Sequence, residues 1–139
     1  MSGRILAVDP GEKRIGVAIS DLTGTIANPL CVIVHVARQV DAARVVELAE
    51  EHGAEKIVVG QPLGEDGVIG PQGRRSERFA EAIRSQTSIP VLLWDESLST
   101  LQAQEARRMM GVSLRRRSGH LDDLAAAVIL QSYLDACER

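Results

Sequence analysis

Apolar residues along the first quarter of the chain are grouped into short runs that predict β-strands. Residues 4–9 form an apolar run that ends in an acid, Asp9, and Pro-Gly then forces a turn. Residues 14–20 are again rich in strand-forming side chains, and they follow so closely that they should return antiparallel through a hairpin. A third strand is expected over residues 26–34, interrupted by Pro29. The chain therefore opens with three predicted strands.

From residue 40 onward the pattern alternates between helices and strands. Apolar residues then recur at close to helical spacing, which predicts a helix that ends at His52-Gly53. Its apolar positions are Val40, Ala43, Val46, Leu48 and Ala49. Residues 56–60 are apolar between their ends, as in a central strand that is covered on both faces. Residues 61–73 contain four glycines and two prolines, which predicts a loop.

The second half of the chain repeats this alternation. A helix is expected through residues 79–83, and residues 90–95 are typical of a strand that again ends in acids. Ser99 and Gln102 fit a capping box that opens a helix over 100–110. An arginine-bearing loop over 111–119 then leads to an amphipathic helix over 122–136, with an apolar stripe at Leu124, Ala127, Val128 and Leu134.

The chain begins with strands, one antiparallel hairpin among them, and then alternates between helices and strands. This order predicts an α/β fold around a mixed sheet. The chain has 139 residues, of which 45% are hydrophobic and 25% charged, so it fits a single globular domain over 1–139. Its apolar runs are too short for a membrane span and its start has no signal-peptide layout, which predicts a cytoplasmic protein with no membrane partner. The two cysteines are too few for a disulfide framework or a zinc site.

Composition and charge restrict the ways in which nucleic acid could be recognised. Phe79, Trp94 and Tyr133 are the only aromatic residues, and three scattered rings cannot form a base-stacking platform. The net charge is −3, but it divides into −4 over residues 1–70 and +1 over 71–139. Between residues 107 and 117 there are five arginines and no acid, a pattern that indicates either a phosphate-binding patch or a solvated helix end.

Three acids occupy positions where a catalytic site is expected. Asp9 ends the first strand, Glu96 follows the strand over 90–95, and Asp122 starts the last helix. If these two strands are parallel neighbours of the strand over 56–60, Asp9 and Glu96 lie at the same sheet edge, where ligands of such sheets bind. Carboxylates without nearby His or Cys suit Mg²⁺ or Mn²⁺, and two such ions about 3.5–4 Å apart support in-line hydrolysis at phosphorus.

Each acid also has a purely structural explanation. Asp122 and Asp123 would stabilise a helix N-terminus as simple caps, and Asp9 before Pro-Gly would favour a turn. Asp95 and Glu96 are adjacent on an extended chain, so at most one of them should face a site.

Four sequence blocks in order give the chain a specific resemblance. They are Asp9-Pro10-Gly11 with 14–18, the run 59–63 with Asp66-Gly67, the run 95–100, and Asp122-Asp123 before 126–131. Together they resemble the YqgF family, described as pre-16S ribosomal RNA nucleases and as Holliday junction resolvases. The resemblance implies a ribonuclease H-like fold, with a five-stranded mixed sheet whose second strand is antiparallel and helices on both faces.

The resemblance also implies a metal-dependent nuclease that hydrolyses phosphodiester bonds. It assigns catalysis to Asp9, Glu96 and Asp122, which with Asp123 as a fourth carboxylate would hold Mg²⁺ or Mn²⁺. Ser97 departs from the family, which usually has arginine there, and this puts phosphate affinity in doubt. The expected nucleic-acid-binding residues are Lys13, Arg14, Arg74, Arg75, Arg107, Arg108, Arg115, Arg116 and Arg117.

Several alternatives stay open at this point. The substrate is either the 5′ end of a pre-16S rRNA or a four-way DNA junction, and the two-fold symmetry of a junction favours a homodimer. A nucleic-acid-binding factor without efficient catalysis is a further reading. ATP binding in the actin style is another, although one domain of 139 residues provides only half of such a cleft.

Overall fold

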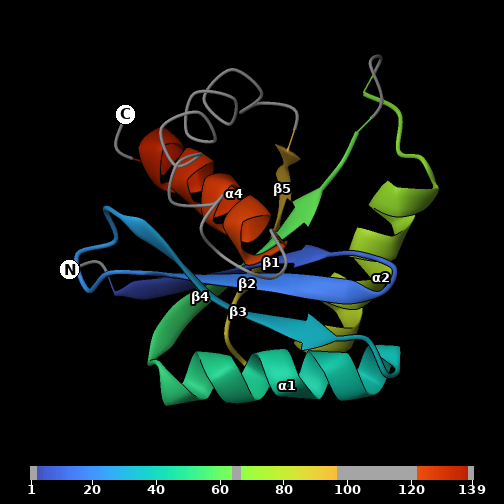
Figure 1. Cartoon of the computed structure of the whole chain (residues 1–139), viewed down its shortest axis with the longest axis horizontal. Helices are drawn as coiled ribbons and strands as arrows, with labels where there is room; N and C mark the ends of the chain where they lie inside the picture. The colour runs from blue at the N-terminus through green and yellow to red at the C-terminus, as the bar shows by residue number, and fades with distance from the viewer. Residues whose placement is uncertain (1–2, 64–66, 97–121, 138–139) are drawn as a thin grey trace, which may run out of the picture.

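The computed structural model describes residues 3–63, 67–96 and 122–137, with backbone only for residues 122 and 123. It contains strands β1 (Arg4–Pro10), β2 (Arg14–Ser20), β3 (Ala27–Val34), β4 (Ala54–Gln61) and β5 (Val91–Asp95), and helices α1 (Arg38–Glu51), α2 (Pro71–Arg84) and α4 (Asp122–Cys137). The strands form one sheet in the order β3-β2-β1-β4-β5 (Figure 1).

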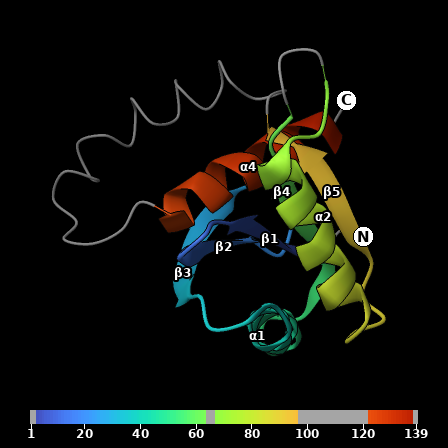
Figure 2. The ribbon, with the colours of Figure 1, turned by 90° about the vertical axis from the view of Figure 1, so that its right-hand side faces the viewer.

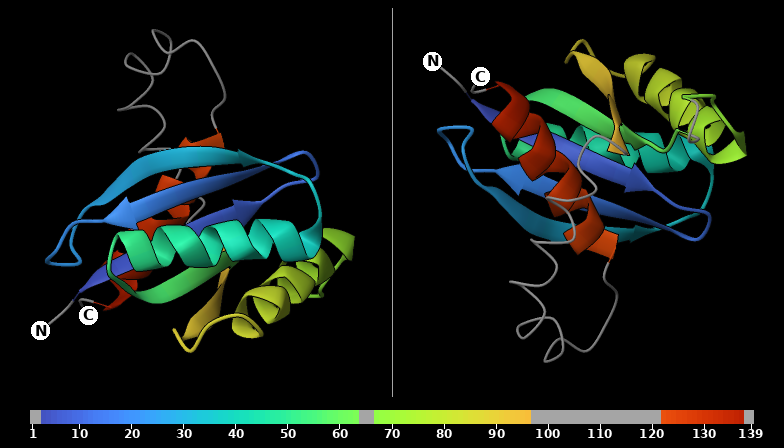
Figure 3. Two further views of the ribbon diagram at one scale, coloured as in Figure 1. Left: turned by 90° about the horizontal axis from the view of Figure 1, so that it is seen from below. Right: turned by 90° about the horizontal axis from the view of Figure 1, so that it is seen from above.

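The sheet is mixed, as the sequence predicts. Strand β2 pairs antiparallel with both β1 and β3, whereas β4 pairs parallel with β1 on one side and with β5 on the other. The predicted five-stranded sheet with an antiparallel second strand is therefore confirmed. Helices α1 and α2 cover one face and α4 crosses the other (Figures 2 and 3).

Alternation along the strands builds two cores, one on each face of the sheet. Leu6, Val8, Val17, Ile57 and Val59 are buried toward α1 and α2. On the opposite face the small side chains of Ala7, Ala18 and Ala27 lie with Val58 beneath α4. Small residues on this face allow α4 to lie close to the sheet.

The burial of α4 extends beyond the predicted stripe. Besides the four stripe residues, the helix buries Ala126, Ile129, Leu130 and Tyr133. Trp94 of β5 meets Tyr133 edge-on, with ring centroids 5.3 Å apart, and its indole N–H donates to the Ser132 hydroxyl at 3.1 Å. Two of the three aromatic rings are thus not scattered, but they hold β5 against α4 and form no base-stacking surface.

The predicted apolar stripe of α1 is confirmed at Val46, Leu48 and Ala49, which are buried, and is wrong at its first two positions. Val40 and Ala43 are exposed, and Asp41 lies on the buried side at 2% exposure. The stripe considered apolar residues alone, whereas the Asp41 carboxylate contacts His35 Nδ1 and accepts the Val36 N–H, and these partners allow a charged residue to be buried.

Two further expectations change in detail. Pro29 does not interrupt β3, because β3 is an edge strand and its register shifts between the pairs Val17–Cys31 and Ala18–Pro29. The loop predicted over 61–73 is shorter, since α2 already begins at Pro71.

The predicted helix over 100–110 and the arginine-bearing loop over 111–119 lie outside the described residues. Within the described residues no helix has the length and apolar character of a membrane span.

The β2–β3 turn is held by one carboxylate. Asp21 Oδ1 accepts the backbone N–H groups of Thr25 at 2.8 Å and Ile26 at 3.0 Å, and Oδ2 accepts the Thr23 hydroxyl. These hydrogen bonds, the one from Ile26 foremost, lower the pKa of Asp21 from 3.8 to about 2.

We expect Asp21→Asn to destabilise the fold at neutral pH and to lose this effect in acid. Because the folded pKa lies below the unfolded one, the stabilisation is present above about pH 4 and disappears as the pH falls through about 2. Urea unfolding of both proteins at pH 7, 3 and 2 measures the difference. A difference in unfolding free energy that is the same at all three pH values would contradict the role of the ionised carboxylate.

Candidate active site

Asp9 and Glu96 come together at the carboxyl edge of the parallel strands. Asp9 is the second-last residue of β1 and pairs with Gly16 of β2, and Glu96 follows β5 directly. Strand β4 lies between β1 and β5 and is parallel to both, so the three strands end at one edge. Both carboxylates are half-buried and line one cleft of about 380 Å³. The predicted meeting of these two acids is thus observed, and Asp95 does not line the cleft.

A glycine in β4 makes room for the Glu96 carboxylate. A Cβ atom at Gly60 would lie 2.7 Å from Glu96 Oε1 and 2.7 Å from Cδ1 of Ile129 in α4. Such distances are too short for real Cβ contacts, so any side chain at this position would displace the end of the Glu96 side chain, the end of the Ile129 side chain, or both. Gly60 therefore positions a candidate catalytic residue without contributing a functional group.

The turn between β1 and β2 forms the floor of the cleft. The Gly11 N–H donates to the Arg14 carbonyl at 2.9 Å, and a Cβ at Gly11 would lie 2.6 Å from the same oxygen. This tight turn places Glu12 and Lys13 beside Asp9 in the cleft wall. The Lys13 carbonyl accepts the His35 N–H at 2.9 Å, which ties the turn to the end of β3.

The first turns of α2 form the opposite wall. Gln72 and Arg75 line the cleft from this helix, and Arg75 Nη2 forms an ion pair with Glu12 Oε1 at 3.3 Å. The buried Gln61 side chain donates to the Gly73 carbonyl at 3.2 Å and so anchors α2 to the end of β4. A Cβ at Gly73 would meet the Pro62 carbonyl at 2.8 Å, which explains the glycine inside this helix.

The predicted site residues divide into three groups. Lys13 and Arg75 join the two carboxylates in the cleft, whereas Arg14 and Arg74 do not line it, and Arg74 Nη1 donates to the Ile69 carbonyl. The backbone of Asp122 and Asp123 opens α4, but their side chains lie outside the described residues. The arginines at 107, 108, 115, 116 and 117 also lie outside the description, as does Ser97.

Sequence reasoning does not find the roles of Glu12 and Gln72, which line the cleft, or of Gly60, which adjoins the Glu96 carboxylate. The run over 59–63 was noted as a motif, and this was the available signal for Gly60. No local pattern marks Glu12 and Gln72, because the Arg75–Glu12 contact joins α2 to a hairpin far away in the sequence.

The donors present in the cleft fit a hard divalent cation. Asp9 and Glu96 supply carboxylate oxygens, which Mg²⁺ and Mn²⁺ prefer. Across the described residues no group of three or more His, Cys, Asp or Glu side chains is arranged so that it could hold a metal ion, and Asp9 and Glu96 are the candidate ligands in this part of the chain.

Comparison with known proteins identifies the class of fold and then the family. The chain superimposes on RuvC of T. thermophilus in complex with a Holliday junction substrate, with a TM-score of 0.65, 16% identity, and coverage of 98% of this chain and 96% of that one. It also matches the fowlpox virus Holliday junction resolvase, with a TM-score of 0.56, 14% identity, and coverage of 96% and 99%. The fold is therefore the ribonuclease H-like α/β fold of these nucleases.

The family follows from sequence. The model described as RuvX, Holliday junction resolvase, matches residues 3–136. A relative from Thermoanaerobacter pseudethanolicus, named "Putative pre-16S rRNA nuclease", is 42% identical over 96% of both chains, and one of the same name from Syntrophus aciditrophicus is 44% identical over 96% of this chain and 89% of its own. The chain belongs to the RuvX family, which confirms the resemblance drawn from the four sequence blocks. It is accordingly a nuclease, a hydrolase of phosphodiester bonds.

Gly60→Ala should strongly reduce the rate of cleavage and only moderately lower the free energy of unfolding. The new methyl group displaces Glu96 Oε1, and a misplacement of about 1 Å at a reacting centre can cost about 100-fold in rate. We expect a loss of at least about 10-fold in the metal-dependent cleavage rate, with a destabilisation of about 1–3 kcal/mol.

Gly70→Ala is the matched control, since a Cβ at Gly70 would meet nothing within 4 Å. Cleavage rates and thermal melts of both variants decide the matter. If Gly60→Ala cleaves as fast as Gly70→Ala, the carboxylate of Glu96 does not need the space over β4.

Proposed function

We propose that this chain is a divalent-metal-dependent nuclease whose catalytic carboxylates are Asp9, Glu96 and Asp122. The observation that carries the proposal is the convergence of Asp9 and Glu96 in one cleft at the carboxyl ends of parallel strands. Asp122 is included because α4 begins there, seven residues before Ile129. Seven residues are close to two helical turns, so the backbone of Asp122 lies on the same side of α4 as the residue that borders Gly60.

The proposed metal is Mg²⁺ or Mn²⁺, held by Asp9, Glu96 and Asp122 with Asp123 as a fourth carboxylate. When bound, such an ion acts as a Lewis acid toward the scissile phosphate and its leaving oxygen. The carboxylates of the chain bind and orient this cation, and their mutual repulsion in its absence favours binding.

Cationic side chains around the cleft are proposed to hold the substrate. Lys13 and Arg75 line the cleft and would contact the phosphate being cleaved or its neighbour. Arg14, Arg74 and the arginines at 107, 108, 115, 116 and 117 are proposed to contact the strand further from the reacting bond.

The proposed substrate is a precursor of 16S rRNA, cleaved at its 5′ end. Its support is the name shared by relatives that match nearly the whole length of both chains. The description of the matching family favours a second candidate, a four-way DNA junction, whose two-fold symmetry would favour a homodimer. We propose a cytoplasmic location for either reaction, because these relatives are bacterial and their ribosomal RNA precursors and chromosomal DNA lie in the cytoplasm.

Glu96→Gln and Asp9→Asn should each abolish cleavage and preserve folding. Loss of partners that merely orient metal ligands costs 10–100-fold, so loss of a ligand itself should cost more than about 100-fold. The matched control is Asp95→Asn, because Asp95 is adjacent in sequence but does not line the cleft. We expect this control to remain active.

The assay uses end-labelled single-stranded RNA, a pre-16S 5′ segment, duplex DNA and a four-way junction, with Mg²⁺, Mn²⁺ or EDTA. The lane that is cut in a metal-dependent way identifies the substrate class. A folded Asp9→Asn protein that cleaves at the wild-type rate would disprove the assignment. Binding without cleavage in every lane would instead support a nucleic-acid-binding factor without efficient catalysis.

A further inference from the structure

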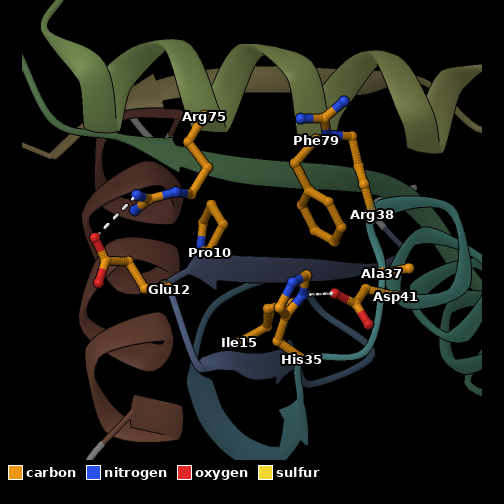
Figure 4. A pocket seen from close by; sticks show the side chains of 10 residues that line it. Pro10, Glu12, Ile15, His35, Ala37, Arg38, Asp41, Arg75 and Phe79 are labelled. Carbon is orange, nitrogen blue, oxygen red and sulfur yellow. Dashed lines mark hydrogen bonds and ion pairs between the residues drawn. The ribbon is translucent and has the colours of Figure 1, made fainter.

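A second hollow, of about 270 Å³, adjoins the carboxylate cleft. The two spaces share the turn residues Pro10, Gly11 and Glu12 and the side chain of Arg75 in their walls. The hollow lies between the β1–β2 hairpin, the start of α1 and the side of α2 (Figure 4), and Asp9 is not among the residues that line it. A strand that occupies the cleft would therefore pass beside this hollow.

Three nitrogen-bearing side chains face the hollow from three different elements. His35 follows β3, Arg38 is the first residue of α1, and Arg75 belongs to α2 (Figure 4). Arg38 forms no ion pair with any residue in the described part of the chain. A cation at a helix N-terminus does not stabilise the helix, because the N-terminus already carries partial positive charge. The Arg38 guanidinium therefore gains nothing from the helix dipole and is available to an anionic ligand in the hollow.

His35 is held in place by a buried carboxylate. Asp41 is only 2% exposed, and its Oδ2 lies 2.5 Å from His35 Nδ1, while its Oδ1 accepts the Val36 N–H at 3.0 Å. With Nδ1–H donated to the Asp41 carboxylate, Nε2 is the remaining ring nitrogen, and it donates to a phosphate oxygen when the ring is in its doubly protonated form. The His35 N–H also donates to the Lys13 carbonyl, so the residue is fixed through both its ring and its main chain.

The size and the floor of the hollow indicate which group would fit. Ile15 and Phe79 are buried beneath it and give it an apolar base. A volume of about 270 Å³ is slightly below the range of about 300–1,000 Å³ for whole small-molecule ligands. The hollow suits a phosphate with part of its sugar better than a complete nucleotide.

Both carboxylates in the wall already have partners. Asp41 is engaged by His35 and Val36, and Glu12 by Arg75 at 3.3 Å. The Glu12 side chain is 74% exposed, and such surface pairs are worth little, so a phosphate can replace Glu12 on Arg75.

We propose that this hollow is a second phosphate subsite, which binds a backbone phosphate of the nucleic-acid strand that runs through the cleft. His35 and Arg38 contact this phosphate, and Arg75 moves from Glu12 onto it. The proposal deepens the proposed function and rests on it only in so far as the ligand is nucleic acid.

The test measures binding of labelled single-stranded RNA by fluorescence anisotropy over a range of salt concentrations. All variants are made in an Asp9→Asn background, so that the strand stays intact. Arg38→Gln should weaken binding roughly 3- to 10-fold at low salt. It should also make the slope of log K against log salt shallower by about 0.7, the value for one phosphate contact on a single strand.

Arg44→Gln is the matched control, since Arg44 lies on the same helix, pairs with Glu47 and does not line the hollow. It should bind like the parent, and Glu12→Gln should bind more tightly because the competing carboxylate is removed. If Arg38→Gln and Arg44→Gln have the same affinity and the same salt slope, the subsite is disproved.

A second arm distinguishes strand phosphates from free ones. Inorganic phosphate and adenosine monophosphate are titrated by calorimetry, and weak binding of both supports the strand subsite. Arg38-dependent binding of adenosine monophosphate as tight as that of RNA would overturn it in favour of a nucleotide site. Because binding is read without cleavage, a failure of the proposed nuclease residues appears in the cleavage panel and not in this measurement.

Discussion

The parallel pairing of β4 with both β1 and β5 is the constraint on which the site depends. Parallel strands require crossover connections, and here α1 and α2 provide them while covering one face of the sheet. Ile57, Val58 and Val59 are fully buried, so a shift in the register of β4 would exchange the side chains that face the two cores. This register fixes where β1 and β5 end, and hence where Asp9 and Glu96 meet.

The place where α4 and the Glu96 side chain lie against β4 shows how the fold gives up some stability to position a candidate catalytic residue. Glycine inside a strand lowers stability because it has no side chain to pack and loses more entropy on folding. Gly60 nevertheless occupies the interior strand β4, since the Glu96 carboxylate and Ile129 already fill the space above it. The alanines beneath α4 act in the same direction, because they let the helix that starts at Asp122 lie low over the same edge.

The sequence was sufficient for those features that depend on local patterns. The strand ends at Asp9 and Glu96, the hairpin return and the buried strand β4 all follow from apolar runs and turn residues, and the structure confirms them. Side-chain contacts could not be predicted, whether they join near or distant segments. His35 and Asp41 are only six residues apart, yet in sequence Asp41 resembles an exposed residue of the first turn of α1. Likewise, the Arg75–Glu12 ion pair joins two walls of the cleft that are far apart in the sequence.

The distribution of charge explains how an acidic chain can bind nucleic acid. The net charge of −3 gives no general attraction to a polyanion, and the packed rings of Trp94 and Tyr133 offer no stacking platform. Recognition must therefore come from cations placed at defined points along the strand. Arg75 lies at the boundary between the carboxylate cleft and the adjoining hollow. In the free protein the Arg75 guanidinium is paired with the Glu12 carboxylate. Because a backbone has the same phosphates whatever its bases, the proposed contacts would select the path and shape of a substrate and not its sequence.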